Sequence, residues 1–156
     1  PHIVARHPDV HFLWAGEGPL TGELKKLLKT YAVADRVSLL GKREDIPDLM
    51  CAVDLFVHPA RFEGQPFSVL EAMAAGVPVV STSASGIAEI IGDGVQGLLC
   101  RPDDVGSLRD RVLHALDHRD EMVAFAEAAR ERVNEFSEAA MVTQTLAAIE
   151  SLAGSR

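Results

Sequence analysis

The amino-acid sequence predicts an α/β fold in which a doubly wound parallel sheet is followed by a helical C-terminal tail. Short apolar runs alternate with amphipathic helical patterns through about the first hundred residues, which is typical of parallel strands with helices on both faces of the sheet. Glycine or proline lies at the end of most of these runs. After Pro102 the apolar residues recur only at helical spacing, so we expect helices alone in that region.

The expected strands are short runs of mostly apolar residues, at 10–15, 37–40, 54–57, 77–80 and 97–100. Between Leu20 and Tyr31 the leucines follow the 3.6-residue period of an amphipathic helix. Further helices are expected at 46–53, 66–76 and 86–91. Trp14 lies within the first strand and is expected to pack in the core.

Apolar stripes with helical periodicity continue beyond Pro102, over residues 105–116, 122–133 and 142–152. Asp103 or Asp104 is expected to cap the first of these helices, because an aspartate side chain accepts hydrogen bonds from the free amides of a first helical turn. We expect all three stripes to pack in a core.

The composition is that of an ordinary globular protein, with 156 residues, 47% of them hydrophobic and 24% charged. A net charge of −8 argues against a nucleic-acid surface, since proteins that follow a phosphate backbone carry a basic stripe. No apolar run is long enough to span a bilayer. Cys51 and Cys100 are too few for a disulfide framework or a metal site, and reduced thiols favour a cytoplasmic protein.

The most informative segment is 61–73, in which Glu63 and Glu71 lie eight positions apart around a Gly-x-Pro break. Proline is favoured in the first turn of a helix, and glycine just outside it. We therefore expect a tight loop that carries Glu63, a helix that opens near Pro66, and Glu71 on the second turn of that helix. Gly76 is expected to end the helix.

This arrangement predicts an anion site. The amides of Phe67, Ser68 and Val69 should lack carbonyl partners and point out of the helix N-terminus, where the helix dipole favours a phosphate. A carboxylate accepts hydrogen bonds from two neighbouring hydroxyl groups, as on a ribose or a hexose. Two carboxylates that bracket an anion site suit a nucleotide-sugar.

The residues of this segment resemble a known family. Glu63-Gly64-x-Pro66, followed by Glu71-Ala-Met-Ala and Gly76-x-Pro-Val-Val, resembles the E-x7-E signature of the GT-B fold retaining glycosyltransferases, in the GT4-like family of group 1 glycosyltransferases. The resemblance covers nearly the whole chain. The flanking segments that agree with the family are Gly16-Glu17-Gly18-Pro19, Leu39-Leu40-Gly41, Asp93-Gly94-Val95-Gln96-Gly97 and Pro102-Asp103-Asp104.

The resemblance implies a Rossmann-like, donor-binding C-terminal domain, and it implies site residues. Glu63 would be the catalytic residue, contacting the hydroxyls of the transferred sugar as a positioning and electrostatic group. Glu71 would hold the ribose, and Arg43 would border the base. The backbone at Pro66, Phe67 and Ser68 would help Glu63 to hold the sugar, and amides near Ser68 and Val69 would face the diphosphate. Gly64 would be a further donor-binding residue. The family transfers its sugar with retention, usually without a metal ion, and no cofactor is expected.

The resemblance also implies boundaries. Residues 1–136 would form the donor-binding domain, truncated at its N-terminal side so that its first strand and the family's phosphate-binding Arg and Lys precede Pro1. Residues 137–156 would form a helix that crosses back to an absent N-terminal domain, and its outer face should then be partly uncovered. That domain would bind the acceptor, whether a sugar, a lipid or a small molecule, and the full-length enzyme could associate peripherally with a membrane. The chain alone is expected to transfer no sugar.

Alternatives remain open from the sequence. A nucleotide-sugar epimerase of the same fold would bind the same ligand, and a non-catalytic nucleotide-binding or signalling module is a third class. Arg43 could be a solvated loop residue, and Arg61 could face a phosphate or, as we favour, simply pair with Glu63. His58 is interpreted as a packed histidine without a role. Ser85 stands where the family commonly has a glycine, which affects the expected shape of that loop.

Overall fold

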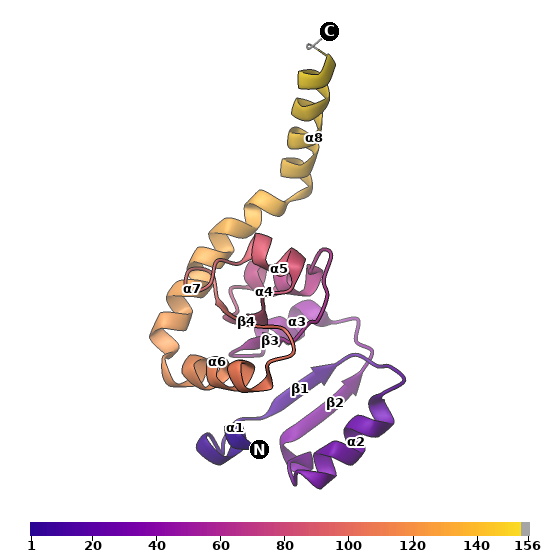
Figure 1. Cartoon of the computed structure of the whole chain (residues 1–156), viewed down its shortest axis with the longest axis vertical. Helices are drawn as coiled ribbons and strands as arrows, with labels where there is room; N and C mark the ends of the chain where they lie inside the picture. Colours follow the sequence, from indigo (N-terminus) through magenta and orange to yellow (C-terminus); the bar gives the residue numbers. More distant parts are fainter. Residues whose placement is uncertain (154–156) are drawn as a thin grey trace. The chain divides into compact units, whose positions relative to one another are not determined.

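The computed structural model describes residues 1–153 and divides into two compact units, one over Pro1–Leu49 and one beginning at Met50 (Figure 1). The helix α3 (Ile46–Cys51) spans the boundary between them. The last three residues of the predicted segment 137–156 lie outside the described residues.

The first unit contains a two-stranded parallel sheet. Phe12 pairs with Val37 and Trp14 with Leu39 across its strands. The elements of this unit, in chain order, are α1 (His2–Arg6), β1 (Phe12–Ala15), α2 (Thr21–Thr30), the 3₁₀ turn η1 (Ala34–Arg36) and β2 (Val37–Gly41). The strands and the long helix lie where the sequence predicts them.

No residue between 1 and 49 is fully buried. The expectation that Trp14 packs in the core is therefore wrong: it is 52% exposed, and its neighbour Leu13 is 44% exposed. Two strands with one main helix offer too little apolar surface to enclose a side chain of that size.

The second unit contains a parallel sheet with the strand order β3-β4-β5. Its first elements, in chain order, are β3 (Phe56–His58), α4 (Phe67–Ala75), β4 (Val79–Thr82), α5 (Ser85–Ile90) and β5 (Leu98–Cys100). The α/β class with parallel strands is confirmed, but the described strands form two sheets rather than one. β3 and β4 each begin two residues later than predicted. Pro78 lies just before β4, since proline has no amide hydrogen to donate to the hydrogen bonds of a sheet.

The core of the second unit surrounds β4, all of whose residues are buried. One face of α4 packs here through Val69, Ala72 and Met73. Gly76 ends α4 in the left-handed conformation, with φ 72°, as the sequence predicts. Buried Ser81 and Thr82 place polar atoms in this core, and both hydroxyl groups donate to backbone carbonyls at the end of β3 and just after it.

Helices follow Pro102 as predicted: α6 (Val105–Asp117), α7 (Arg119–Arg132), the 3₁₀ turn η2 (Val133–Phe136) and α8 (Glu138–Ala153) (Figure 1). The first two apolar stripes are partly buried, through Val112, Met122 and Ala129, although Val105 at the start of α6 is 80% exposed. The third stripe was expected in the core, and that expectation is wrong, because α8 has no buried residue. The helical C-terminal region is confirmed. That the exposed α8 crosses to another domain stays a prediction.

The start of α6 gives a first testable prediction. Asp104, one of the two expected caps, accepts a hydrogen bond from the Ser107 amide at 2.8 Å. Asp104→Ala should lower the free energy of unfolding by about 0.5–2 kcal/mol, because a first-turn amide loses its acceptor. Chemical denaturation measures this, and Asp110→Ala within the same helix is the control for the lost charge. Equal losses from both variants would contradict the capping role.

The two thiols differ in environment. Cys51 is exposed and Cys100 is buried in β5, and burial raises the pKa of the Cys100 thiol. A raised pKa leaves less thiolate at any given pH, and burial also blocks access. Iodoacetamide at pH 8 should therefore modify Cys51 in the folded protein and Cys100 only after denaturation, as read by mass spectrometry of peptides. Modification of both at similar rates in the folded state would contradict the described burial.

Candidate functional site

The loop between β3 and α4, residues 59–66, carries the first of the two predicted glutamates. Buried hydroxyl groups of β4 hold its beginning in place: the Ser81 Oγ donates to the carbonyl of His58 at 2.9 Å, and the Thr82 Oγ1 donates to the carbonyl of Ala60 at 2.5 Å. These bonds satisfy the only buried polar side chains of the strand and tie the loop to the centre of the sheet. The loop is thus built on a rigid element.

Glu63 is held at both its side chain and its backbone. Its Oε2 lies 3.3 Å from the Nε2 of His58, and the two side chains are 27% and 19% exposed. Its carbonyl accepts hydrogen bonds from the Gly86 amide and the Ser85 hydroxyl, both at 3.1 Å. The His58 contact was missed by the sequence analysis, which gave that residue no role; the local signal was a histidine at the end of a strand, five residues before the glutamate.

The start of α5 packs closely against this loop. A Cβ atom at Gly86 would lie 2.2 Å from the carbonyl oxygen of Gly64, a distance that real Cβ atoms do not reach. Only glycine fits here without movement of the backbone. Ser85, which departs from the family pattern, uses its hydroxyl group to bind the same loop, so the departure adds a contact rather than opening a gap.

The N-terminus of α4 corrects one expectation. Phe67 and Val69 were expected to have free amides, but the Phe67 amide donates to the Gln65 carbonyl at 2.9 Å and the Val69 amide to the Pro66 carbonyl at 3.0 Å. The chain tightens into short-range turns there, which use up those donors. The Ser68 amide has no hydrogen-bond acceptor within residues 1–153. One free amide, rather than three, therefore remains for an anion at this end.

Glu71 lies on the second turn of α4, as predicted, between the buried Leu70 and Ala72. Its carboxylate is exposed and has no hydrogen bond or ion pair with any described residue. It is thus available to a ligand. The Pro66 and Val69 side chains are buried, and the Val69 amide is bonded within the helix start, so neither residue offers its side chain to a ligand.

The two arginines have acidic partners. Arg43 binds Asp45 through both its Nε and its Nη2, and this pairing raises the pKa of Arg43 and lowers that of Asp45. Arg43 lies in the first unit, apart in sequence from the Glu63 loop. The suggestion that Arg61 pairs with Glu63 is wrong, because its Nε donates to the Oδ1 of Asp103 at 2.7 Å. That partner follows Arg61 by 42 residues, which no local pattern could indicate.

A groove of about 660 Å³ borders the start of α4. Gln65 and Phe67 form one side of it, and residues of η2 and α8 form the other, from Glu135 to Ala148. Glu63 and Glu71 do not line this groove. Phe67 is 65% exposed, so an apolar ring stands at the rim beside the free amide of Ser68. Among the described residues, none of the helices has both the length and the apolar character needed to cross a membrane.

Comparison with known proteins finds a family whose profile matches this chain. A family profile described as "Glycosyl transferases group 1" matches residues 1–118. The lipopolysaccharide core biosynthesis mannosyltransferase LpsB of Rhizobium meliloti is 37% identical over 124 residues, which cover 75% of this chain and 35% of LpsB. The N-acetyl-alpha-D-glucosaminyl L-malate synthase of Bacillus anthracis is 34% identical over 127 residues, covering 81% of this chain and 33% of that enzyme.

Solved structures agree with this family. The crystal structure of Anabaena HepE in complex with UDP-glucose superposes with a TM-score of 0.82, at 28% identity, over 92% of this chain and 41% of HepE. The chain thus spans about a third of the length of the curated relatives it matches. The segment that matches this chain is therefore only one part of each of these relatives.

Proposed function

This chain belongs to the group 1 glycosyltransferases, and we propose that it is the donor-binding part of such an enzyme, one that transfers a hexose with retention from a nucleotide-diphosphate sugar to an acceptor hydroxyl. The binding of UDP-glucose by the related HepE supports a donor of this class.

In this proposal the start of α4 binds the diphosphate. The observation that carries it is the unpaired Ser68 amide at the positive end of a helix, with the free carboxylate of Glu71 one turn further along. An amide without an acceptor gains a full hydrogen bond from a phosphate oxygen, and the helix dipole adds to the attraction. Glu71 then accepts from the two ribose hydroxyls, and the backbone of Gly64, Pro66 and Phe67 borders the transferred sugar.

Glu63 positions the transferred sugar. Its carboxylate is held by the His58 ring, which fixes its rotamer and leaves acceptor capacity for sugar hydroxyls. A fixed negative charge close to the reacting carbon would also favour the positive charge that develops there as the leaving group departs. The proposal requires no metal ion at this site and no cofactor.

The remaining parts of the proposal concern the longer enzyme. An acceptor sugar, lipid or small molecule would bind to a domain outside this chain, and α8 would cross toward that domain. We place the enzyme in the cytoplasm, with peripheral membrane association where the acceptor is a lipid. Arg43 would border the base once its bond to Asp45 opens.

Calorimetric titration of the chain with UDP, GDP and ADP tests the proposal. We expect saturable binding of at least one of them, in competition with its sugar-bearing form. Ser68→Pro, which removes the free amide, should abolish binding, while Ser68→Ala, which keeps it, should not. Proline is tolerated in a first helical turn, so the variant is expected to fold. Absence of binding for all three nucleotides, in a chain shown to be folded by circular dichroism, would contradict the proposal.

The His58 contact makes a prediction of its own. His58→Phe keeps an aromatic ring beside Phe56 but removes the donor to Glu63. The variant should bind the nucleotide-sugar about threefold to tenfold more weakly, because one hydrogen bond contributes about 0.5–1.5 kcal/mol. Its affinity for the free nucleoside diphosphate should be unchanged. Titration with both ligands separates these effects, and equal losses for both would mean that His58 acts only on the fold.

A further inference from the structure

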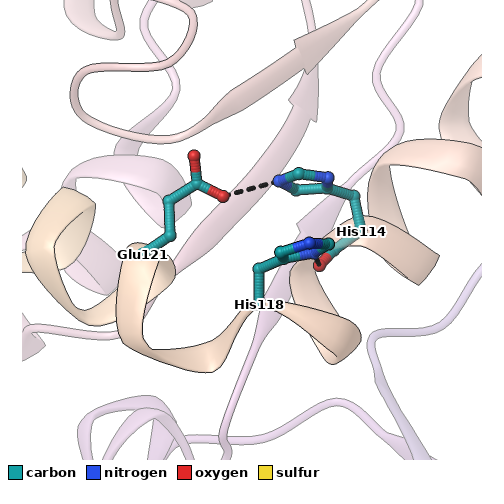
Figure 2. Close-up of side chains that lie close together, drawn as sticks. All are labelled: His114, His118 and Glu121. Carbon is teal, nitrogen blue, oxygen red and sulfur yellow. Dashed lines mark hydrogen bonds and ion pairs between the residues drawn. The ribbon is translucent and has the colours of Figure 1, made fainter.

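A cluster of two histidines and a glutamate lies where α6 meets α7 (Figure 2). His114 is in the last turn of α6, Glu121 is in the first turn of α7, and His118 is the single residue between the two helices. One nitrogen or oxygen atom of each side chain lies within 4.8 Å of those of the other two. We propose that His114, His118 and Glu121 form a binding site for a divalent metal ion of the zinc type.

The hydrogen bonds set the protonation state of His118. Its Nδ1 lies 2.9 Å from the carbonyl oxygen of His114, and because a carbonyl only accepts, the Nδ1 carries the proton. The Nε2 of a neutral His118 is then left with a free lone pair. Histidines that bind metals commonly have their other ring nitrogen engaged in such a bond, which fixes the tautomer and orients the ring.

The second histidine already faces the third ligand. The Nε2 of His114 lies 2.6 Å from the Oε2 of Glu121, so a ring N–H of His114 donates its proton to a hydrogen bond with the carboxylate (Figure 2). A metal ion takes the place of that proton, since it binds the deprotonated nitrogen and the ionised carboxylate together. The set of two imidazoles and one carboxylate suits zinc rather than magnesium or calcium, which prefer oxygen ligands.

The rings must turn to bind. His114 and His118 are stacked, with centroids 4.0 Å apart and planes 15° from parallel, so their lone pairs do not converge on one point. Zinc lies about 2.0–2.1 Å from each imidazole nitrogen, which requires one ring to rotate out of the stack. The side chains of His114 and Glu121 are 39% and 45% exposed, and His118 is also exposed, so the rotation meets little packing. Three protein ligands leave a coordination position for water.

A simpler account of the cluster is an ion pair between helix ends. The pair would join the C-terminus of α6 to the N-terminus of α7, and the Glu121 carboxylate interacts favourably with the dipole of α7. This account explains the bond between His114 and Glu121. It gives no function to the stacked His118, whose free nitrogen is the feature that points to a metal.

Calorimetric titration with zinc chloride distinguishes the two, with the chain free of any histidine tag. We expect one saturable site. His114→Ala and His118→Ala should each weaken it at least tenfold, since even loss of an outer-shell partner costs about 10–100-fold in metal affinity. His11→Ala, an exposed histidine of the other unit bound to Ser38, is the matched control and should leave the affinity unchanged.

Nuclear magnetic resonance locates the ion independently. Zinc should shift the ring signals of His114 and His118 and leave those of His11 in place, while magnesium should shift none of them. If zinc produces neither heat nor shifts of these ring signals in the wild type, the cluster is only an ion pair between helix ends and the proposal is overturned. Zinc binding of equal strength in the double variant His114→Ala/His118→Ala would overturn it as well. Neither result bears on the donor site, whose residues lie on other elements.

Discussion

Replacing Glu71 with alanine is expected to weaken the binding of a nucleoside diphosphate by about tenfold to a hundredfold. The carboxylate lies exposed on the second turn of α4 without a partner in residues 1–153, so its bonding capacity is unused in the free protein. Hydrogen bonds from ribose hydroxyls to a charged acceptor are worth about 1.5–3 kcal/mol. The fold should be unaffected, because an exposed helical glutamate contributes little to the core.

Calorimetric titration measures this loss, and Glu127→Ala is the matched control. Glu127 is an exposed glutamate of α7 and its removal changes the net charge by the same amount. If the two variants bind the nucleotide as strongly as the wild type does, Glu71 is not part of the site. If both bind it more strongly, the effect is one of net charge alone.

Replacing Gly86 with alanine is expected to disturb both stability and donor binding. The added methyl group would lie 2.2 Å from the Gly64 carbonyl oxygen and 3.0 Å from that of Glu63, so the loop has to move. Overpacking of this kind costs about 1–3 kcal/mol in the free energy of unfolding. The Gly86 amide and the Ser85 hydroxyl would lose their common acceptor, and Glu63 would leave its position beside His58.

Denaturation and titration with a nucleotide-sugar measure the two effects. Gly22→Ala is the control, since it lies in α2 with open space around the added atom and should raise helix stability by about 0.5–1 kcal/mol. A Gly86→Ala variant as stable as the wild type, with full affinity for the nucleotide-sugar, would contradict the described contact between α5 and the loop.

The local parts of the site could be predicted from sequence. A proline at the start of α4 and a glycine at its end are signals that act within one turn, and both lie where the pattern placed them. The position of Glu71 follows from the helix start by counting. The number of free amides could not be predicted in the same way, because the choice between a regular and a tightened first turn depends on the φ and ψ angles of Gln65 and Pro66.

Burial and long-range pairing could not be predicted. Trp14 and the apolar stripe of α8 have the periodicity of core elements, but periodicity only says that a face is apolar and not that another surface covers it. The bond from Arg61 to Asp103 joins positions far apart in the chain. The contact between His58 and Glu63 depends on the course of a loop that the β4 hydroxyl groups hold.

The central claim is that the start of α4 binds a diphosphate between two ligand-binding glutamates. Titration of the ¹⁵N-labelled chain with a nucleotide-sugar, followed by amide chemical shifts, tests it most directly. We predict that the largest shift is at the Ser68 amide, with further shifts at Gly64 and Gly86 that the free nucleoside diphosphate does not produce. Shifts that leave residues 63–71 unchanged while the ligand binds elsewhere would contradict the claim.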